Sequence, residues 1–267
     1  MPLILPVETP DDPRVAAYCA VRERDLVGRE GRFVAESEGV LRTLLSPRSR
    51  FAPESLLVAE PRLAGLSDAV EGLGPEVPVY VASRATMAAV AGFPIHRGVL
   101  AVGRRGPEPD PDALLAGLGP DAVVVVLVGL TNHDNVGAVF RNAAAFGAAA
   151  VILDAATCDP LYRKAIRVSV GACLTVPFAR SMQAGALLDS LAAHGFAPLA
   201  LTPAGEADVS ELRPSGRTAL VLGTEGDGLP AGVLARCRTV RIAMAPGHDS
   251  LNVAVAGAIA LHRLARS

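Results

Sequence analysis

The first residues that could do chemistry are an asparagine and an arginine inside the otherwise mostly small and apolar stretch NHDNVGAVFRNAAAFG. Asn135 is a residue type that caps helices, so a helix is predicted over residues 135–146. Arg141 follows Gly137 by one turn, and helical side chains lean toward the N-terminus, which directs the guanidinium at the helix start. An anion or a ribose phosphate could bind there. The alternative is a structural arginine that pairs with Asp134 or with a carbonyl group.

A glycine-rich loop, LVLGTEGDGLP, is the second such segment. Gly223, Gly226 and Gly228 follow an apolar run and permit close approach of the backbone to a ligand. The loop lacks the lysine of a Walker A motif, and the carboxylate of Glu225 is unfavourable in a phosphate cradle. It suits instead a ligand with hydroxyl groups or a positive charge, such as a ribose or a sulfonium. A tight turn without a ligand is the alternative.

The third segment is the C-terminal stretch VRIAMAPGHDSLNVAVAGAIALHRLARS. A strand is predicted to end at Met244, and Asp249 or Ser250 is predicted to cap a final helix over residues 250–266. This helix is apolar on nearly all faces, which is typical of a helix in the core or at a subunit interface. Ser250 and Asn252 are polar groups at its entrance, and capping explains one of them but not both.

These segments follow apolar runs of strand length, over residues 123–130, 150–154, 198–203, 218–223 and 240–244. Their apolarity is continuous rather than alternating, which indicates strands buried on both faces of a mostly parallel sheet. Ligands bind such sheets beyond the carboxyl ends of the strands. Helices are predicted over residues 135–146, 163–173, 182–194, 230–236 and 250–266.

The first part of the chain has the same alternation on a smaller scale. Strands are predicted over residues 56–59, 79–82 and 99–102, and helices over residues 12–27, 39–45 and 84–91. Residues 106–120 are rich in proline, glycine and aspartate, which is typical of a boundary. We therefore predict an α/β protein with a small domain at residues 1–105, a linker at 106–120 and a larger, mostly parallel domain at 121–267.

The composition restricts the class of protein. Hydrophobic residues make up 51% of the 267 residues and the mean hydropathy is +0.37. No uncharged apolar run approaches the roughly 18–20 residues that span a bilayer, and the N-terminus lacks the basic region of a signal peptide, so a soluble, cytoplasmic protein without a membrane partner is expected. Four scattered cysteines without a CxxC pair predict no metal site. The net charge of −2 is not the basic charge typical of a nucleic-acid-binding domain.

Together, and in this order, the three segments resemble the motifs of the SpoU (TrmH) family of RNA ribose methyltransferases, over residues 121–267. The matching residues are Asn132, Asn135, Val136, Gly137, Arg141, Phe146 and Gly147, then Gly223, Thr224, Glu225, Gly226, Gly228 and Leu229, then Ile242, Met244, Ser250, Leu251, Asn252 and Val253. A connecting segment with Arg167, Ser169, Gly171 and Ala172 is also similar. Ala243, Ala254 and His262 depart from the family, which usually has Pro, Ser and Tyr there.

The resemblance implies a SPOUT fold, in which the C-terminal segment forms a deep trefoil knot, and a homodimer. It implies S-adenosyl-L-methionine (SAM) as the cofactor and methylation of a ribose 2′-hydroxyl in RNA. The first domain is weakly similar to the family's RNA-binding domain. Because a separate domain of this kind precedes the catalytic one, 23S ribosomal RNA is favoured over tRNA as the substrate.

The resemblance also assigns roles to individual residues. Arg141 is the predicted catalytic residue, and since a guanidinium hardly ever loses its proton, we expect it to bind a phosphate and the developing oxyanion rather than act as a base. Asn135 would orient the ribose, Glu225 would hold the loop or a hydroxyl group, and Ser250 and Asn252 would complete the pocket. The predicted cofactor-binding residues are Thr202, Leu222, Gly223, Gly228, Ile242, Met244 and Leu251.

Two other interpretations stay open. One is a knotted protein that binds RNA without methylating it, which intact polar residues in all three motifs disfavour. The other is an unrelated nucleotide-binding enzyme that uses the Gly223 loop for phosphate, which the missing lysine and the presence of Glu225 disfavour.

Overall fold

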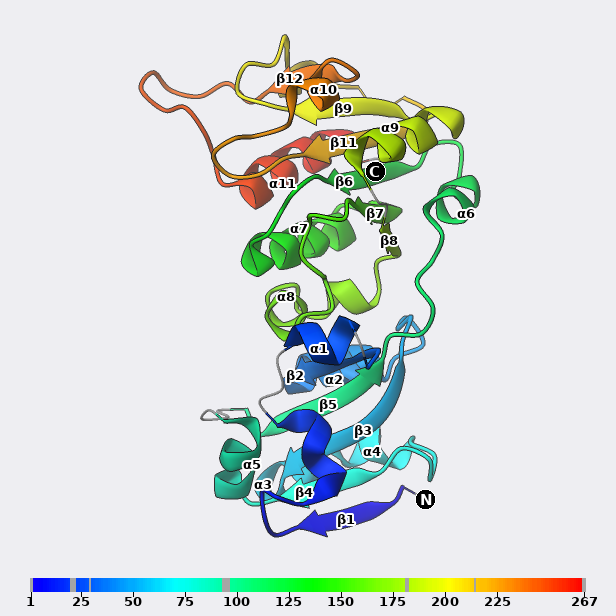
Figure 1. Ribbon diagram of the computed structural model, residues 1–267, viewed down its shortest axis with the longest axis vertical. Coiled ribbons are helices and arrows are strands. Elements are labelled where there is room, and N and C mark those ends of the chain that lie inside the picture. Colours follow the sequence, from blue (N-terminus) through cyan, green and yellow to red (C-terminus); the bar gives the residue numbers. More distant parts are fainter. Residues whose placement is uncertain are drawn as a thin grey trace. The chain divides into compact units, whose positions relative to one another are not determined.

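The chain folds into two compact units in the computed structural model (Figure 1). The structure describes residues 2–19, 23–28, 30–92, 97–180, 183–213 and 215–265. The N-terminal unit comprises Met1–Pro107 and Leu161–Thr175, and the C-terminal unit comprises Glu108–Pro160 and Val176–Ser267. None of the helices in the described ranges combines the length and the apolarity that a bilayer-spanning segment needs.

The described part of the C-terminal unit is built on a seven-stranded parallel sheet. The strand order is β10-β12-β9-β11-β6-β7-β8, so β11 is inserted between two strands that precede it in the sequence. The strands are β6 (Val123–Leu127), β7 (Ala150–Leu153), β8 (Phe178–Arg180), β9 (Ala197–Leu201), β10 (Ala207–Asp208), β11 (Thr218–Leu222) and β12 (Arg238–Arg241). The prediction of an α/β fold with a mostly parallel sheet is thereby confirmed.

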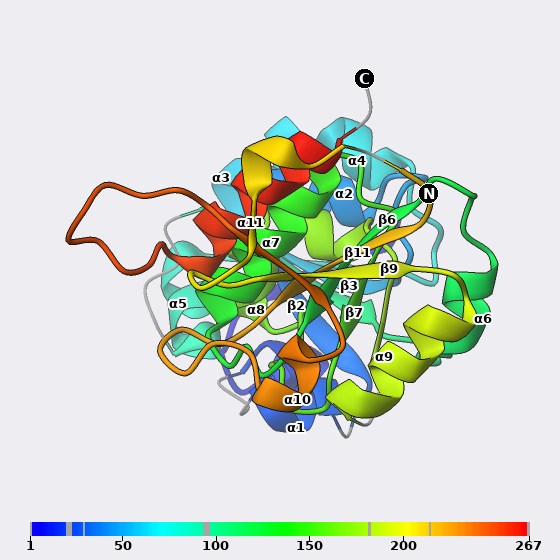
Figure 2. The ribbon, with the colours of Figure 1, turned by 90° about the horizontal axis from the view of Figure 1, so that it is seen from above.

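Helices cover both faces of this sheet (Figure 2). On one face, α6 (Pro111–Ala116), α9 (Ala184–Ala193) and α10 (Ala231–Leu234) bury leucine and valine side chains against the central strands in one apolar cluster. Helices also cover the opposite face, so the strands have side chains buried on both sides of the sheet. This burial explains why their sequences are continuously apolar.

On the opposite face, α7 (His133–Ala145) and α11 (Val253–Leu264) pack against each other, and α11 also packs against β11. Gly257 of α11 faces Leu222 of β11, and a Cβ atom added to this glycine would lie 2.9 Å from Leu222 Cδ1. The missing side chain therefore lets α11 approach the sheet closely, which offsets the poor helix propensity of glycine.

The five strands predicted for this part of the chain are all present, with ends shifted by up to three residues. β8 and β10 were not predicted, because runs of three and two residues carry too little periodicity to be recognised. The predicted helices over residues 182–194 and 250–266 each include a residue outside the described ranges, and α9 and α11 lie within their described parts, with α11 beginning three residues later than predicted.

The N-terminal unit holds a mixed sheet whose described strands follow the order β1-β4-β3-β5-β2. β1 (Ile4–Val7), β4 (Val79–Ala82) and β3 (Ala52–Ala59) are parallel, and β5 (Val99–Arg104) runs antiparallel to β3 and to β2 (Arg32–Glu36). Three of these were predicted. β1 and β2 were missed because a proline or charged residues interrupt their short apolar runs.

The helices of the N-terminal unit are short. The predicted helix over residues 12–27 is wrong, because the 3₁₀ helix Pro13–Tyr18 ends at Cys19, whose backbone is extended, and α1 (Glu23–Gly28) is a separate helix. The other helical segments in the described part of residues 1–107 are α2 (Glu38–Leu44), α3 (Glu60–Leu63), the 3₁₀ helix Ala64–Leu66, α4 (Ser67–Glu71) and α5 (Arg84–Ala91).

One segment from the second half of the chain packs with the N-terminal unit. α8 (Arg163–Val168) lies against β2, and the N–H of Arg50 donates to the carbonyl of Leu174 at 3.0 Å. The sequence placed residues 161–175 in the domain at 121–267, whereas the structure assigns them to the N-terminal unit. Sequence order did not reveal this because the packing partners are more than 100 residues away.

The helix predicted over residues 163–173 is also shorter than expected. It ends at Val168 because Val170 (φ 53°) and Gly171 (φ 83°) take left-handed backbone conformations, and a 3₁₀ turn over Ala172–Leu174 follows. A β-branched valine in this region is unusual, and the strain is located in an exposed turn.

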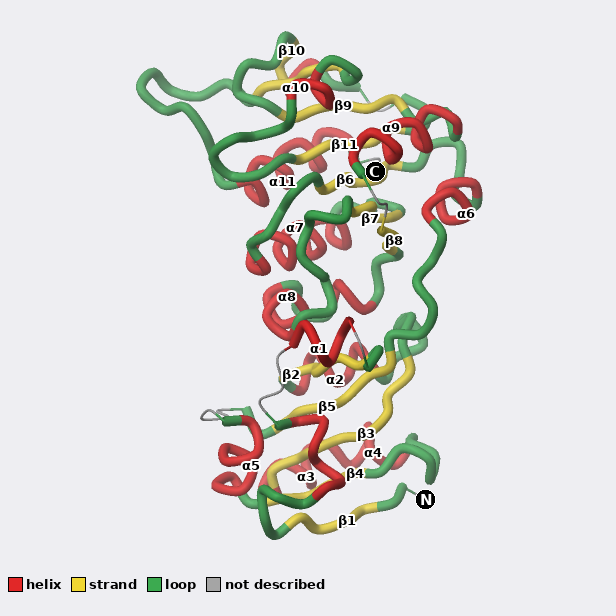
Figure 3. Tube along the Cα trace, in the orientation of Figure 1, coloured by secondary structure: helices red, strands yellow, loops and turns green. Residues whose placement is uncertain are grey.

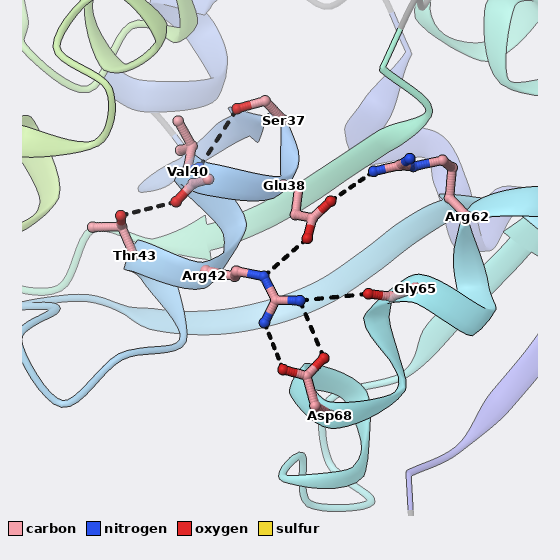
Figure 4. Close-up of polar contacts among 9 residues, drawn as sticks. Ser37, Glu38, Val40, Arg42, Thr43, Arg62, Gly65 and Asp68 are labelled. Atoms are coloured by element: carbon pink, nitrogen blue, oxygen red, sulfur yellow. Dashed lines mark hydrogen bonds and ion pairs between the residues drawn. The ribbon is translucent and has the colours of Figure 1, made fainter.

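A chain of ion pairs ties α2 to the helices that follow β3 (Figure 4). Glu38 accepts hydrogen bonds from Arg42 at 3.0 Å and from Arg62 at 2.6 Å, and Arg42 also pairs with Asp68 at 2.7 Å and donates to the carbonyl of Gly65. The hydrogen bond from Arg42 lowers the pKa of Asp68. Since these groups are largely exposed, the cluster orients the helices more than it stabilises the unit.

Candidate active site

The C-terminal unit contains a cavity of about 620 Å³ beyond the carboxyl ends of β9, β11 and β12. These three strands are neighbours in the sheet, so the residues that follow each of them meet at one edge. The loop over residues 242–252, which follows β12, extends from the sheet as a long segment without regular structure (Figure 3). Its two ends supply one wall of the cavity.

Every residue that the sequence assigned to the cofactor lines this cavity. They are Thr202, Leu222, Gly223, Gly228, Ile242, Met244 and Leu251. Of the predicted catalytic residues, Glu225, Ser250 and Asn252 line it too, whereas Asn135 and Arg141 lie outside it on α7. The fold thus gathers the predicted residues of two motif loops, while their individual roles stay predictions.

The loop over residues 223–229 is a tight hairpin. The N–H and the hydroxyl group of Thr224 both donate to the carbonyl oxygen of Gly228, at 3.3 Å and 3.2 Å. A Cβ atom on Gly223 would lie 2.7 Å from the backbone of Gly228, and Gly226 has a φ of 100°. Close approach and backbone conformation therefore require glycine in this loop, independently of any ligand.

Asn252 caps the final helix. Its Oδ1 atom accepts hydrogen bonds from the N–H groups of Ala254 at 3.0 Å and Val255 at 3.2 Å. The prediction that Asp249 or Ser250 caps this helix was wrong, because the backbone is not yet helical at either position. Both residues lie in the preceding loop and line the cavity instead.

The amide nitrogen of the same side chain is free for other bonds. Nδ2 of Asn252 donates to Oε1 of Glu225 at 2.8 Å and to Oδ1 of Asn135 at 2.9 Å. This orientation of the amide follows from the two backbone N–H groups that face its oxygen. One carboxamide therefore connects the glycine-rich loop, the final helix and α7.

Asn135 lies inside α7 rather than at its cap. Asn132 is the cap, with its Oδ1 accepting from the N–H of Asp134 at 2.8 Å, so the prediction of Asn135 as the cap was wrong. Asn135 is only 6% exposed and faces α11, and Asn142, two turns further on, donates to the carbonyl of Ala254 at 2.8 Å. Residues seven apart share a face of a helix, so both asparagines join α7 to the start of α11.

Arg141 is exposed on α7. Within the described ranges, no side chain or carbonyl group is bonded to its guanidinium, so the structural pairing with Asp134 is not present. Arg141 follows Asn135 by six residues, which corresponds to about 9 Å along the helix axis. An arginine that is not committed to a partner in its own chain is available for an anionic ligand.

A buried network supports the loop that leads into α7. Asp154 is 6% exposed, and its Oδ1 accepts from the N–H of Gly129 at 3.0 Å and from the hydroxyl group of Thr157 at 2.7 Å. The hydroxyl oxygen of Thr157 in turn accepts from the N–H of Leu130 at 3.2 Å. The backbone before α7 is thereby fixed to the end of β7, which positions the helix that carries Asn135.

The charge of the cavity is acidic. Among the described lining residues, Glu225 and Asp249 are charged, and no lysine, arginine or histidine is present. Asp249 was not predicted as a residue of the site, because its type and position also fit a helix cap, although its place directly before Ser250 in the third motif was a signal. In the described residues, no group of three or more His, Cys, Asp or Glu side chains could hold a metal ion.

Comparison with known proteins agrees with this geometry. Residues 122–262 match the SpoU rRNA Methylase family. An uncharacterised tRNA/rRNA methyltransferase from Mycobacterium tuberculosis is 41% identical over 97% of this chain and 90% of its own length. A 23S rRNA (guanosine-2′-O-)-methyltransferase from Acinetobacter baylyi is 34% identical over 77% of this chain and 84% of its own length.

A solved structure has the same fold. The AdoMet-bound rRNA methyltransferase from Sinorhizobium meliloti aligns with 98% of this chain and 97% of that chain, with a TM-score of 0.82 and 22% identity. The match in sequence and the shared architecture confirm the resemblance seen in the three motifs. The chain therefore belongs to the SpoU family of RNA methyltransferases.

Proposed function

We propose that this protein transfers a methyl group from SAM to a ribose 2′-hydroxyl of RNA, with 23S ribosomal RNA as the favoured substrate. The observation that carries the proposal is the carboxamide of Asn252, which donates both to Glu225 at the cavity and to Asn135 of α7. These two bonds connect a cavity suited to the cofactor with the helix that carries the uncommitted Arg141.

The cavity has the size and the charge that SAM requires. Its volume of about 620 Å³ lies within the range of roughly 300–1,000 Å³ for small-molecule sites. The cofactor carries a sulfonium and an ammonium group, which Glu225 and Asp249 attract, and Leu222 and Ile242 offer apolar surface to its adenine ring. The AdoMet-bound Sinorhizobium meliloti protein of the same fold supports this choice. A phosphate-bearing nucleotide would meet two carboxylates, which disfavours a nucleotide-binding enzyme.

Arg141 supplies the positive charge that the reaction needs. A ribose 2′-hydroxyl is a weak nucleophile, so the site must stabilise the alkoxide that forms on it. A guanidinium group stays protonated and cannot accept the proton of the hydroxyl group, which passes to solvent water, but it binds an RNA phosphate and stabilises negative charge on the neighbouring oxygen. Ser250 orients the ribose, and Asn135 acts through Asn252, whose amide donates to its side-chain oxygen. SAM, when bound, supplies an electrophilic methyl group on a positively charged sulfur.

The substrate is ribosomal RNA bound partly by the N-terminal unit, and the enzyme acts in the cytoplasm. The Acinetobacter baylyi relative, which methylates a guanosine 2′-oxygen of 23S rRNA according to its name, supports this choice. A tRNA is the second candidate, because the name of the mycobacterial relative leaves both kinds of RNA open. A knotted protein that binds RNA without methylating it is the third.

The proposal includes a trefoil knot at the C-terminus. α11 packs against α7 and β11, and Asn142 of α7 donates to the carbonyl of Ala254 more than 100 residues later. The insertion of β11 between β9 and β6 is a further non-local arrangement that a threaded chain explains.

The proposed enzyme is a homodimer. Val255 and Ile259 lie one turn apart on α11 and are 51% and 37% exposed, so they form an exposed apolar stripe on this helix. A second copy of the chain would cover this stripe. Replacing Ile259 with glutamate should give a monomer in size-exclusion chromatography with light scattering, and an unchanged mass would contradict the assignment.

One comparison tests the function. Ribose 2′-O-methyl groups are mapped in all RNA from a strain that lacks the gene and from the same strain carrying the wild-type or the Arg141→Ala protein. We expect one nucleotide of 23S rRNA to lose its methyl group and to regain it only with the wild-type protein. Loss in a tRNA would select the second candidate, and no loss together with no calorimetric binding of SAM would select the third.

A further inference from the structure

Asp249 places a carboxylate at the cavity, and this residue does not cap α11. Asn252 caps α11, and Asp249 lies three residues earlier in the loop and lines the cavity. In the described part of the chain, no hydrogen-bond donor or cation is bonded to its side chain.

The other charged residue of the cavity is already engaged. Oε1 of Glu225 accepts a hydrogen bond from Asn252, whose amide also contacts Asn135 on the helix of Arg141. Glu225 is therefore tied to the side of the cavity where the methyl acceptor must lie. Asp249 is exposed and adds a second carboxylate to the lining of the same cavity, so this lining attracts a ligand that carries positive charge.

We propose that Asp249 binds the ammonium group of SAM. This inference rests on the proposed function. The sulfonium has no hydrogen to donate, and it must face the methyl acceptor, on the Glu225 side. The ammonium group has three donors and matches a carboxylate whose acceptors are all free. Three residues of extended chain reach about 10 Å, so Asp249 can lie at the other end of the ligand from Asn252.

Calorimetric titration of the full chain with three ligands tests the proposal. SAM and S-adenosylhomocysteine both carry the ammonium group, and 5′-methylthioadenosine carries neither the ammonium nor the sulfonium group. For Asp249→Asn, we expect the affinity for the first two to fall by about ten-fold, and the affinity for 5′-methylthioadenosine to stay within about two-fold. High salt should narrow the difference from wild type for the first two ligands.

Asp227→Asn is the matched control. Asp227 lies in the neighbouring glycine-rich loop, is exposed, and is not among the described lining residues, so its substitution removes the same charge without touching the cavity. All three affinities of this variant should stay within about two-fold of wild type.

Three results would overturn the assignment to Asp249. Unchanged affinity of Asp249→Asn for SAM would show that the carboxylate does not contact the ligand. A loss confined to SAM, with S-adenosylhomocysteine unaffected, would assign the carboxylate to the sulfonium instead. An equal loss for 5′-methylthioadenosine would indicate damage to the cavity. Failure of the wild-type chain to bind SAM would instead overturn the proposed function.

Discussion

Replacing Asn252 with alanine removes two kinds of hydrogen bond. The side-chain oxygen caps α11, and the loss of such a cap costs about 1 kcal/mol. The side-chain nitrogen donates to the buried oxygen of Asn135, and leaving that acceptor without a donor costs about 1–3 kcal/mol. Glu225 is exposed and regains its hydrogen bond from water, so it adds little. The free energy of unfolding should therefore fall by about 2–4 kcal/mol.

Asn252→Asp separates the two roles. Aspartate caps helices as well as asparagine does, and its charge is favourable at a helix N-terminus. It has no donor, however, and it would place a carboxylate against the oxygen of Asn135 and the carboxylate of Glu225. We expect this variant to lose about 1–3 kcal/mol although its cap is intact. Urea unfolding followed by circular dichroism measures both variants.

Stability of Asn252→Asp equal to that of wild type would refute this reasoning, because the bond to Asn135 would then contribute nothing beyond the cap. A double-mutant cycle of Asn252→Ser with Asn135→Ala gives a second measure. Serine keeps a capping oxygen but cannot replace the amide donor. The coupling energy should be about 0.5–3 kcal/mol, and a value of zero would also refute the bond.

Three other experiments test separate parts of the structure. Arg141→Ala should change the free energy of unfolding by less than about 0.5 kcal/mol, because the side chain is exposed and uncommitted, yet lower single-turnover methylation by at least about 100-fold; normal turnover would contradict its role. Gly223→Ala should abolish calorimetric SAM binding, because its Cβ atom would lie 2.7 Å from the backbone of Gly228 and would force the loop apart. Gly226→Ala meets no atom within 4 Å, so it should cost only about 1 kcal/mol of backbone strain and should still bind SAM. Equal losses of SAM binding in the two variants would contradict the hairpin geometry. Burial, and to a smaller extent the neighbouring carboxylate of Asp159, raises the pKa of the Cys158 thiol from 9.0 to about 11. Iodoacetamide at pH 8 should therefore alkylate this thiol about 100-fold more slowly than it alkylates an unstructured cysteine peptide. Equal alkylation rates, measured by mass spectrometry, would show that the pKa is normal.

The sequence predicted those strands whose burial on both faces decides their residue types. Strands such as β6 and β11 are buried on both faces, and continuous apolarity follows directly from that burial. The insertion of β11 between β9 and β6 depends on contacts between distant residues, which local patterns do not contain. The packing of residues 161–175 with the N-terminal unit was missed for the same reason.

The site was predicted as a set of residues but not as a set of bonds. Residues after the strand ends, such as Thr202 and Gly223, line the cavity because parallel strands end together. The network of Asp154 and Thr157 gave no signal in the sequence, because its partners are backbone groups, which every residue has. Asp249 was not predicted as a residue of the site, because an aspartate just before a helix also fits the role of an N-cap.

Both capping errors have one physical origin, and correcting them explains the centre of the site. Asparagine, aspartate and serine are all good caps, so a cluster of them does not identify the residue whose backbone is about to become helical. In α7 the cap is Asn132, which leaves Asn135 inside the helix with its oxygen pointing at α11. In α11 the cap is Asn252, which uses its oxygen for the helix and keeps its nitrogen for Asn135 and Glu225. Serine or aspartate at position 252 would cap equally well but lack the amide donor, so the chemistry of both bonds together requires a carboxamide there.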